Sequence, residues 1–186
     1  MKSMKRAIIM LTLTVCWANA RSQERGNLDA ASIDNFEARV AEYVKLHNTA
    51  KEKLARLTPT DAPSAIKRHE HELIREIRGM RRQARQGDIF SAGISAQFRR
   101  LIGITMKGPQ AARIQDSLQR AEPVRLELQV NAAYPASVPL QSTPPSLLMN
   151  LPKLPPEVDY RVVGDKLVLR DVEANLIVDF IPHAIP

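Results

Sequence analysis

Three short runs near the C-terminal end, residues 158–181, alternate apolar and polar side chains as half-buried strands do. The dipeptide Gly164-Asp165 separates the first two runs and supplies a two-residue turn that suits the twist of paired strands. Pairing outward from this turn predicts five opposed pairs: Val163 with Lys166, Val162 with Leu167, Arg161 with Val168, Tyr160 with Leu169 and Asp159 with Arg170. The register gathers the apolar side chains on one face.

The third run completes a predicted antiparallel meander. Its alternation predicts two sides, with Leu176, Val178 and Phe180 on one, and Ile177, Asp179 and Ile181 on the other. Three short strands with one apolar face are only marginally stable alone in water, so the preceding part of the chain must cover that face.

The preceding part reads as helical over residues 32–122. An apolar seam recurs at spacings of three and four residues: Phe36, Val40, Tyr43, His47, Ala50, Leu54 and Leu57. After a Pro-containing break, where Thr60 or Asp61 can cap the next helix, a second helix is expected from about 63 to 86. Together they predict a long antiparallel hairpin over 34–86. Two further helices follow, one capped by Asp88 and one opened by Pro109.

Residues 123–186 are predicted to hold the sheet and an extended segment. Val124 to Val130 alternate apolar and polar residues and read as a fourth strand. Seven prolines then fall within residues 131–156, which are too apolar for a free linker and are expected to lie extended along the body. The fold class predicted is therefore α+β, with a helical hairpin and two more helices packed on a small antiparallel sheet.

The N-terminal residues 1–20 have the order of a secretory signal peptide. A basic start is followed by an apolar run and by Ala18-Asn19-Ala20, a small-x-small cleavage site. The sequence thus predicts cleavage after Ala20, a disordered leader over 21–31, and a periplasmic or extracellular protein without a transmembrane segment. Lipidation at Cys16 is an alternative, although Val15 is bulky for the position before a lipobox cysteine.

Composition excludes some classes of function. Removal of Lys2, Lys5 and Arg6 with the leader lowers the net charge from +7 to +4, which is too small for a nucleic-acid-binding footprint. Removal of Cys16 leaves no cysteine and therefore no disulfide. The chain contains no recognisable catalytic or cofactor motif, so we expect no enzyme, no catalytic residue and no cofactor, with a small hydrolytic enzyme as a distant alternative.

A row of arginines is the main candidate for binding. At 100° per residue, one side of the predicted second helix carries Arg68, Arg75, Arg78, Arg82 and Arg85. Such a row is typical of a solvated helix face. It also fits a patch for an acidic protein, an anionic lipid or an envelope polyanion.

Histidines supply a second candidate. His47 occupies a seam position from which it can face His69 or Glu72, and His47 with His69 forms a candidate metal pair. A buried, hydrogen-bonded structural histidine is the competing interpretation. Four acidic residues lack the spacing of a calcium loop and read as ordinary turn and strand residues: Asp165, Asp171, Glu173 and Asp179.

Two resemblances follow from the segment Gln86-Gly87-Asp88-Ile89-Phe90 and the C-terminal block. Together they resemble a family of short exported bacterial proteins without an assigned function. The run YRVVGDKLVLRDVEANLIVDFI is also similar to the terminal hairpin of the RcnB-type periplasmic proteins of nickel and cobalt homeostasis. The sequence therefore predicts a non-enzymatic binding protein of the bacterial envelope, with a metal-handling protein as the alternative. The partner and the oligomeric state are left open.

Overall fold

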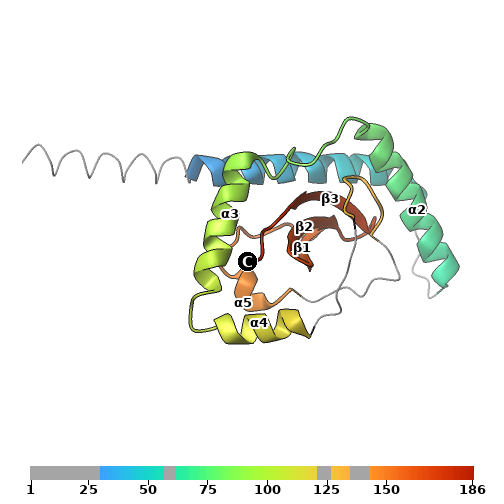
Figure 1. Ribbon diagram of the computed structural model, residues 1–186. Coiled ribbons are helices and arrows are strands. Elements are labelled where there is room, and N and C mark those ends of the chain that lie inside the picture. Colours follow the sequence, from blue (N-terminus) through green and yellow to red (C-terminus); the bar gives the residue numbers. More distant parts are fainter. Residues whose placement is uncertain (1–29, 57–61, 121–126, 135–142) are drawn as a thin grey trace, which may run out of the picture.

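The protein has an α+β fold, as predicted, in which helices surround a three-stranded antiparallel sheet (Figure 1). The computed structural model describes residues 30–56, 62–120, 127–134 and 143–186. The predicted signal peptide, its cleavage site, Cys16 and nearly all of the predicted leader lie outside the described residues. No helix in the described ranges is long and apolar enough to cross a membrane.

The first described helix, residues 30–52, follows the predicted seam. Its side chains Phe36, Val40, Tyr43, His47 and Ala50 are all buried, which confirms the assignment for these positions. Leu54 is partly buried just after the helix, and position 57 lies outside the described residues. The seam faces the sheet and helix α3, and it carries two side chains of the site described below, Tyr43 and His47.

Helix α2, Pro63–Met80, is shorter than predicted. Pro63 stands at its first turn as expected, and Leu73, Ile74 and Ile77 are buried. The candidate caps at positions 60 and 61 lie outside the described residues. The helix ends at Met80 instead of near residue 86, so the predicted hairpin over 34–86 is truncated. In Figure 1 α2 runs obliquely to the first helix and not side by side with it.

The described residues contain three more helices. They are α3, Ala92–Thr105, α4, Ala111–Gln119, and the short α5, Pro145–Leu148, within the proline-rich segment. The N-cap of α3 is Ser91. Asp88 was predicted to cap this helix, but its carboxylate instead accepts a hydrogen bond from the backbone N–H of Arg85. Phe98 of α3 packs its ring against three others, those of Phe36, Phe90 and Tyr160.

The sheet consists of β1, Val158–Val163, β2, Lys166–Asp171, and β3, Leu176–Ile181, in that order. All five predicted pairs between β1 and β2 are present. Gly164 in the connecting turn has φ 59°, a left-handed conformation that glycine adopts without steric cost. Arg170 is 5% exposed and donates to both carboxylate oxygens of Asp159, so the predicted charge pair is formed and largely buried.

The predicted sides of β3 are only partly right. Between β2 and β3 the register shifts by one residue next to Leu169, and Val178 is left without an opposed partner. A bulge of this kind moves the residues on its two sides relative to simple alternation. As a result Val178, Asp179 and Ile181 are all fully buried on the main-core side, while Ile177 and Phe180 join a small cluster on the other side.

Residues 127–134 cover that second side of the sheet. The predicted strand 124–130 lies partly outside the described residues, and its described part, 127–130, is not a strand. Pairing with β3 occurs a few residues later, where Ala133 forms a bridge opposite Leu176. In the proline-rich segment, residues 143–156 pack along the body as predicted, and Leu147 and Leu151 are buried. The prediction that this segment is extended throughout was wrong, because Pro145–Leu148 form helix α5.

A buried carboxylate on β3 ties the sheet to the segment between α2 and α3. Asp179 is 0% exposed and accepts hydrogen bonds from the backbone N–H groups of Gly87, Ile89 and Phe90 at 2.8–3.2 Å. It was predicted to be an ordinary strand-face residue. The bulge turns it inward, where charge-assisted hydrogen bonds replace its hydration. This contact links the segment 86–90 with the C-terminal block.

Candidate functional site

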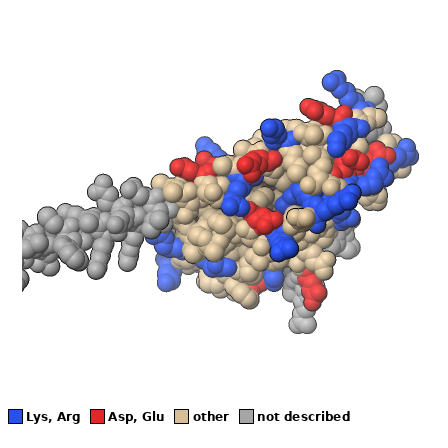
Figure 2. Space-filling view, turned by 90° about the horizontal axis from the view of Figure 1, so that it is seen from above, with Lys and Arg blue, Asp and Glu red and all other residues tan. Residues whose placement is uncertain are grey.

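The predicted row of arginines divides into two parts. Arg68, Arg75 and Arg78 are exposed residues of α2, whereas Arg82 and Arg85 are exposed but follow the end of the helix. We call these five residues the arginine face. Figure 2 shows Lys and Arg side chains gathered toward the end of the molecule that carries α2, with acidic side chains among them. The single helical row inferred from 100° spacing therefore extends only as far as Met80.

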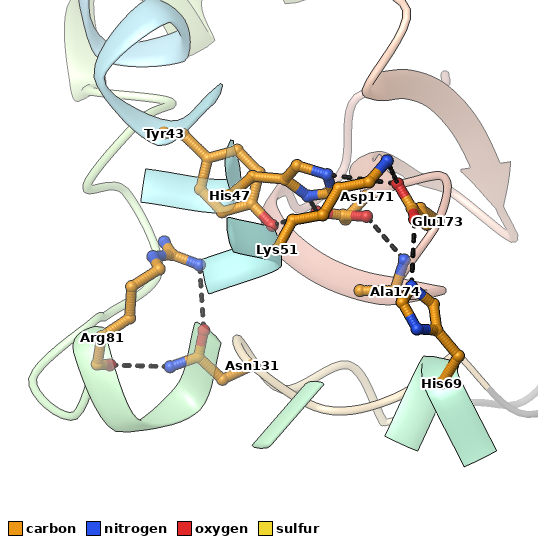
Figure 3. Close-up of polar contacts among 9 residues, drawn as sticks. All are labelled: Tyr43, His47, Lys51, His69, Arg81, Asn131, Asp171, Glu173 and Ala174. Atoms are coloured by element: carbon orange, nitrogen blue, oxygen red, sulfur yellow. Dashed lines mark hydrogen bonds and ion pairs between the residues drawn. The ribbon is translucent and has the colours of Figure 1, made fainter. Parts of the chain in front are cut away.

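Arg81 explains why the helix ends where it does. Its backbone leaves the helical conformation, with φ −117° and ψ 37°. Its guanidinium lies 5.0 Å from the centre of the Tyr43 ring and donates to the side-chain oxygen of Asn131 at 2.9 Å and to the carbonyl of Val178 at 3.2 Å. Figure 3 shows this pairing of Arg81 with Asn131, whose amide returns a hydrogen bond to the Arg81 carbonyl. This role of Arg81 was not predicted from the sequence.

A hollow of about 350 Å³ lies on the arginine face. It is lined by His71, Ile74, Arg75, Arg78 and Ala133. The α2 members are spaced at three, four and seven residues from the first, so they occupy one side of the helix. His71 was missed as a candidate although this spacing places it between Arg75 and Arg78; the signal was in the sequence. Ala133 belongs to the segment that was predicted to lie extended along the body.

The two histidines of the candidate metal pair meet on one carboxylate. The His47 Nε2 lies 3.5 Å from Glu173 Oε2, and the His69 Nε2 lies 3.3 Å from Glu173 Oε1. Lys51 also contacts Glu173 Oε2, at 2.6 Å (Figure 3). Within the ranges that the structure describes, no group of three or more His, Cys, Asp or Glu side chains could hold a metal ion. Glu72, the other residue proposed to face His47, makes no hydrogen bond or ion pair with it; His47 contacts Asp171 and Glu173 instead.

Asp171 organises the buried end of this cluster. It is 0% exposed and accepts a hydrogen bond from the Tyr43 hydroxyl at 2.6 Å and another from the Ala174 backbone N–H at 2.7 Å. The oxygen that accepts from Tyr43, Asp171 Oδ2, also lies 2.6 Å from His47 Nδ1. We name Tyr43, His47, Lys51, His69, Asp171 and Glu173 the histidine–carboxylate cluster. It joins helix 30–52, α2 and the turn between β2 and β3.

Charge in the cluster favours a protonated His47. Burial opposes protonation, but the hydrogen bond to Asp171 and the negative charges of Asp171 and Glu173 outweigh it and raise the pKa of His47. Burial and then the Asp171 charge raise the pKa of Tyr43, which keeps its hydroxyl a donor. Partial burial disfavours ionised Glu173, but Lys51 more than compensates and lowers the pKa of that carboxyl. The cluster is thus a satisfied network of opposite charges.

Replacement of His47 by Asn should make stability less dependent on pH. Because the pKa of His47 is raised on folding, its contribution is complete below the ordinary histidine value of about 6.5 and is lost as pH rises through the raised value. The difference in unfolding free energy between wild type and His47→Asn should therefore shrink from pH 5.5 to pH 8.5, as measured by urea denaturation. A difference that stays constant over this range would contradict the assignment.

Comparisons with known proteins identified no relative of this chain. No protein-family model matches the chain, and searches of curated proteins and of solved structures found no match.

Proposed function

We propose that the protein is an exported, non-enzymatic binding protein of the bacterial envelope that recognises an anionic partner through its arginine face. One observation carries the proposal. The guanidinium groups of Arg68, Arg75 and Arg82 are exposed and form no ion pair within the described part of the chain. Their charge is therefore available to a partner.

Stability alone is a poor reason for such a face. Exposed ion pairs contribute only about 0–1 kcal/mol to folding, and like charges close together on one surface repel. The end of α2 is instead fixed by neutral acceptors, since Arg78 donates to the Asn131 carbonyl at 2.7 Å and Arg81 to Asn131 and Val178. A fixed, positively charged surface favours association with an anionic one by orienting and attracting it.

Export is supported by the succession of a basic start, an apolar run and Ala18-Asn19-Ala20 in residues 1–20. The partner classes that fit the arginine face in the envelope are an acidic protein, an anionic lipid or a polyanion. Lipidation at Cys16 remains the alternative to cleavage after Ala20, and the mass of the mature protein distinguishes them.

Reversal of three free charges should abolish binding without unfolding the protein. The variant Arg68→Glu/Arg75→Glu/Arg82→Glu changes exposed residues only. We expect purified protein carrying it to lose retention on isolated envelopes, because attraction becomes repulsion, while its melting temperature stays close to that of wild type. Wild-type retention should fall as salt shortens the Debye length from about 10 Å at 0.1 M to about 3 Å at 1 M.

A matched variant controls for net charge. Lys107→Glu/Arg113→Glu/Lys153→Glu makes the same change in charge at exposed residues away from α2. This control protein should be retained on envelopes like wild type. Equal loss of retention in both triple variants would show that only net charge matters. Retention of the Arg68→Glu/Arg75→Glu/Arg82→Glu protein would refute the proposal.

Metal handling is the alternative function, because His47 and His69 share Glu173. Nickel, cobalt or zinc binding at micromolar concentration, lost in His47→Ala, would favour it over anion recognition.

A further inference from the structure

We propose that the hollow beside α2 is a seat for the phosphoryl group of a phosphate ester. This inference rests on the proposed function and narrows it from an anionic surface to a defined site. The hollow has a volume of about 350 Å³, and its lining includes two guanidinium groups and one imidazole, from Arg75, Arg78 and His71. Two arginines match the charge of a phosphate dianion, and planar guanidinium forks match its oxygens.

The polar side chains of the hollow make few contacts within the fold. Arg75 and His71 are exposed and have no hydrogen-bond or ion-pair partner among the described residues. Arg78 uses only its Nε within the fold, to donate a hydrogen bond to the Asn131 carbonyl at 2.7 Å. That bond orients the guanidinium and leaves its terminal nitrogens free. A pre-oriented donor loses less conformational freedom when it binds a ligand.

The backbone opposite α2 supplies a further donor. In the bridge between Ala133 and Leu176, the neighbouring residues make the hydrogen bonds: the Ile177 N–H donates to the Ala132 carbonyl, and the Tyr134 N–H donates to the Asn175 carbonyl. In this arrangement the N–H of Ala133 points away from β3, and it has no backbone acceptor among the described residues. Since Ala133 lines the hollow, a bound oxyanion can accept from this N–H as well as from the arginines.

The hollow is larger than a phosphoryl group, so its size indicates what else the ligand contains. A phosphoryl group alone fills only part of a cavity of about 350 Å³, which is at the small end of the range for organic ligands. Ile74, only 5% exposed, gives the hollow an apolar element beside its cationic groups. The chemistry therefore fits a phosphate ester with a small organic part, which could be a soluble metabolite or a lipid headgroup.

The test is an NMR titration of the whole mature protein. Inorganic phosphate and glycerol phosphate should each give saturable shifts of the Ala133 amide and of the Arg75 and Arg78 Nε–H signals, whereas chloride at equal ionic strength should not. Arg75→Gln should weaken binding about tenfold or more, because it removes charged hydrogen bonds. Vesicles of phosphatidic acid in neutral lipid then separate the sources: binding to vesicles with weak binding of glycerol phosphate indicates a headgroup, and the reverse indicates a metabolite.

A substitution that keeps every charge separates this inference from the proposed function. Ala133→Leu should fill the hollow and abolish the phosphate shifts at Arg75 and Arg78, while Ala112→Leu, at an exposed position of α4, should leave them unchanged. If phosphate gives no saturable shift, or Ala133→Leu still binds it, the seat is refuted even where charge reversal abolishes envelope retention. If phosphate binds but charge reversal leaves retention intact, the proposed function fails and the seat stands.

Discussion

Substitution of Asp179 by Ala should lower the free energy of unfolding by about 3–5 kcal/mol, because it leaves several buried N–H donors without an acceptor. The carboxylate accepts from Gly87, Ile89 and Phe90 and from its own neighbour Phe180. Urea denaturation monitored by circular dichroism measures the loss. Hydrogen exchange should show the amides of residues 87–90 becoming less protected than those of β1 and β2.

A second substitution controls for the loss of volume. Asp179→Asn keeps the size and one carbonyl acceptor but loses the charge and turns an amide group toward donors. The free energy of unfolding of Asp179→Asn should lie between that of wild type and that of Asp179→Ala. A cost for Asp179→Ala below about 1 kcal/mol, the range of an exposed polar change, would show that the segment 87–90 is not held by this carboxylate.

Substitution of Phe98 by Ala should cost a similar amount, about 3–5 kcal/mol, by leaving a cavity at the centre of the main core. Phe98 is 0% exposed, and its ring centre lies 5.2 Å from that of Phe36, 5.7 Å from Phe90 and 6.0 Å from Tyr160. It therefore joins helix 30–52, α3 and β1. Thermal and urea unfolding of the variant measure the effect.

The matched control is an exposed apolar residue. Met149 is 82% exposed, so Met149→Ala should change the unfolding free energy by less than about 0.5 kcal/mol. Similar costs for the two variants would mean that the sheet and helices do not share the core described above.

Local pattern was sufficient for the β1–β2 hairpin and for the seam of the first helix. Gly164-Asp165 selects one turn, and the turn selects one register, so both steps are decided by neighbours in sequence. The register does not confine apolar side chains to one face, because Val163 and Val168 are buried in the second cluster. The seam from Phe36 to Ala50 likewise follows from spacing alone.

The remaining features depend on contacts between distant residues. The bulge at Val178 shifts one residue in β3 and buries Asp179, and no local pattern marks it. The early end of α2 depends on Arg81 reaching Asn131 and Val178. The pattern placed His47 in the seam, but its buried partner Asp171 is 124 residues away and could not be identified from spacing.

Only part of the candidate binding site was predicted, because the rest depends on contacts between distant residues. Helical spacing brought Arg75 and Arg78 to one side of α2, and it would also have included His71. Ala133 could not be found in this way, because its place opposite α2 depends on pairing with β3.

Site-specific crosslinking in intact cells is the most direct test of whether the arginine face binds an anionic partner. A photoreactive amino acid replaces His71, on the arginine face, or Ile66, which is 46% exposed and lies on the opposite side of α2. We expect a crosslinked product from position 71, its loss when Arg68→Glu and Arg82→Glu are added, and no such product from position 66. Products of equal yield from both positions, or a product from position 71 that survives the charge reversal, would contradict recognition of an anionic partner by the arginine face.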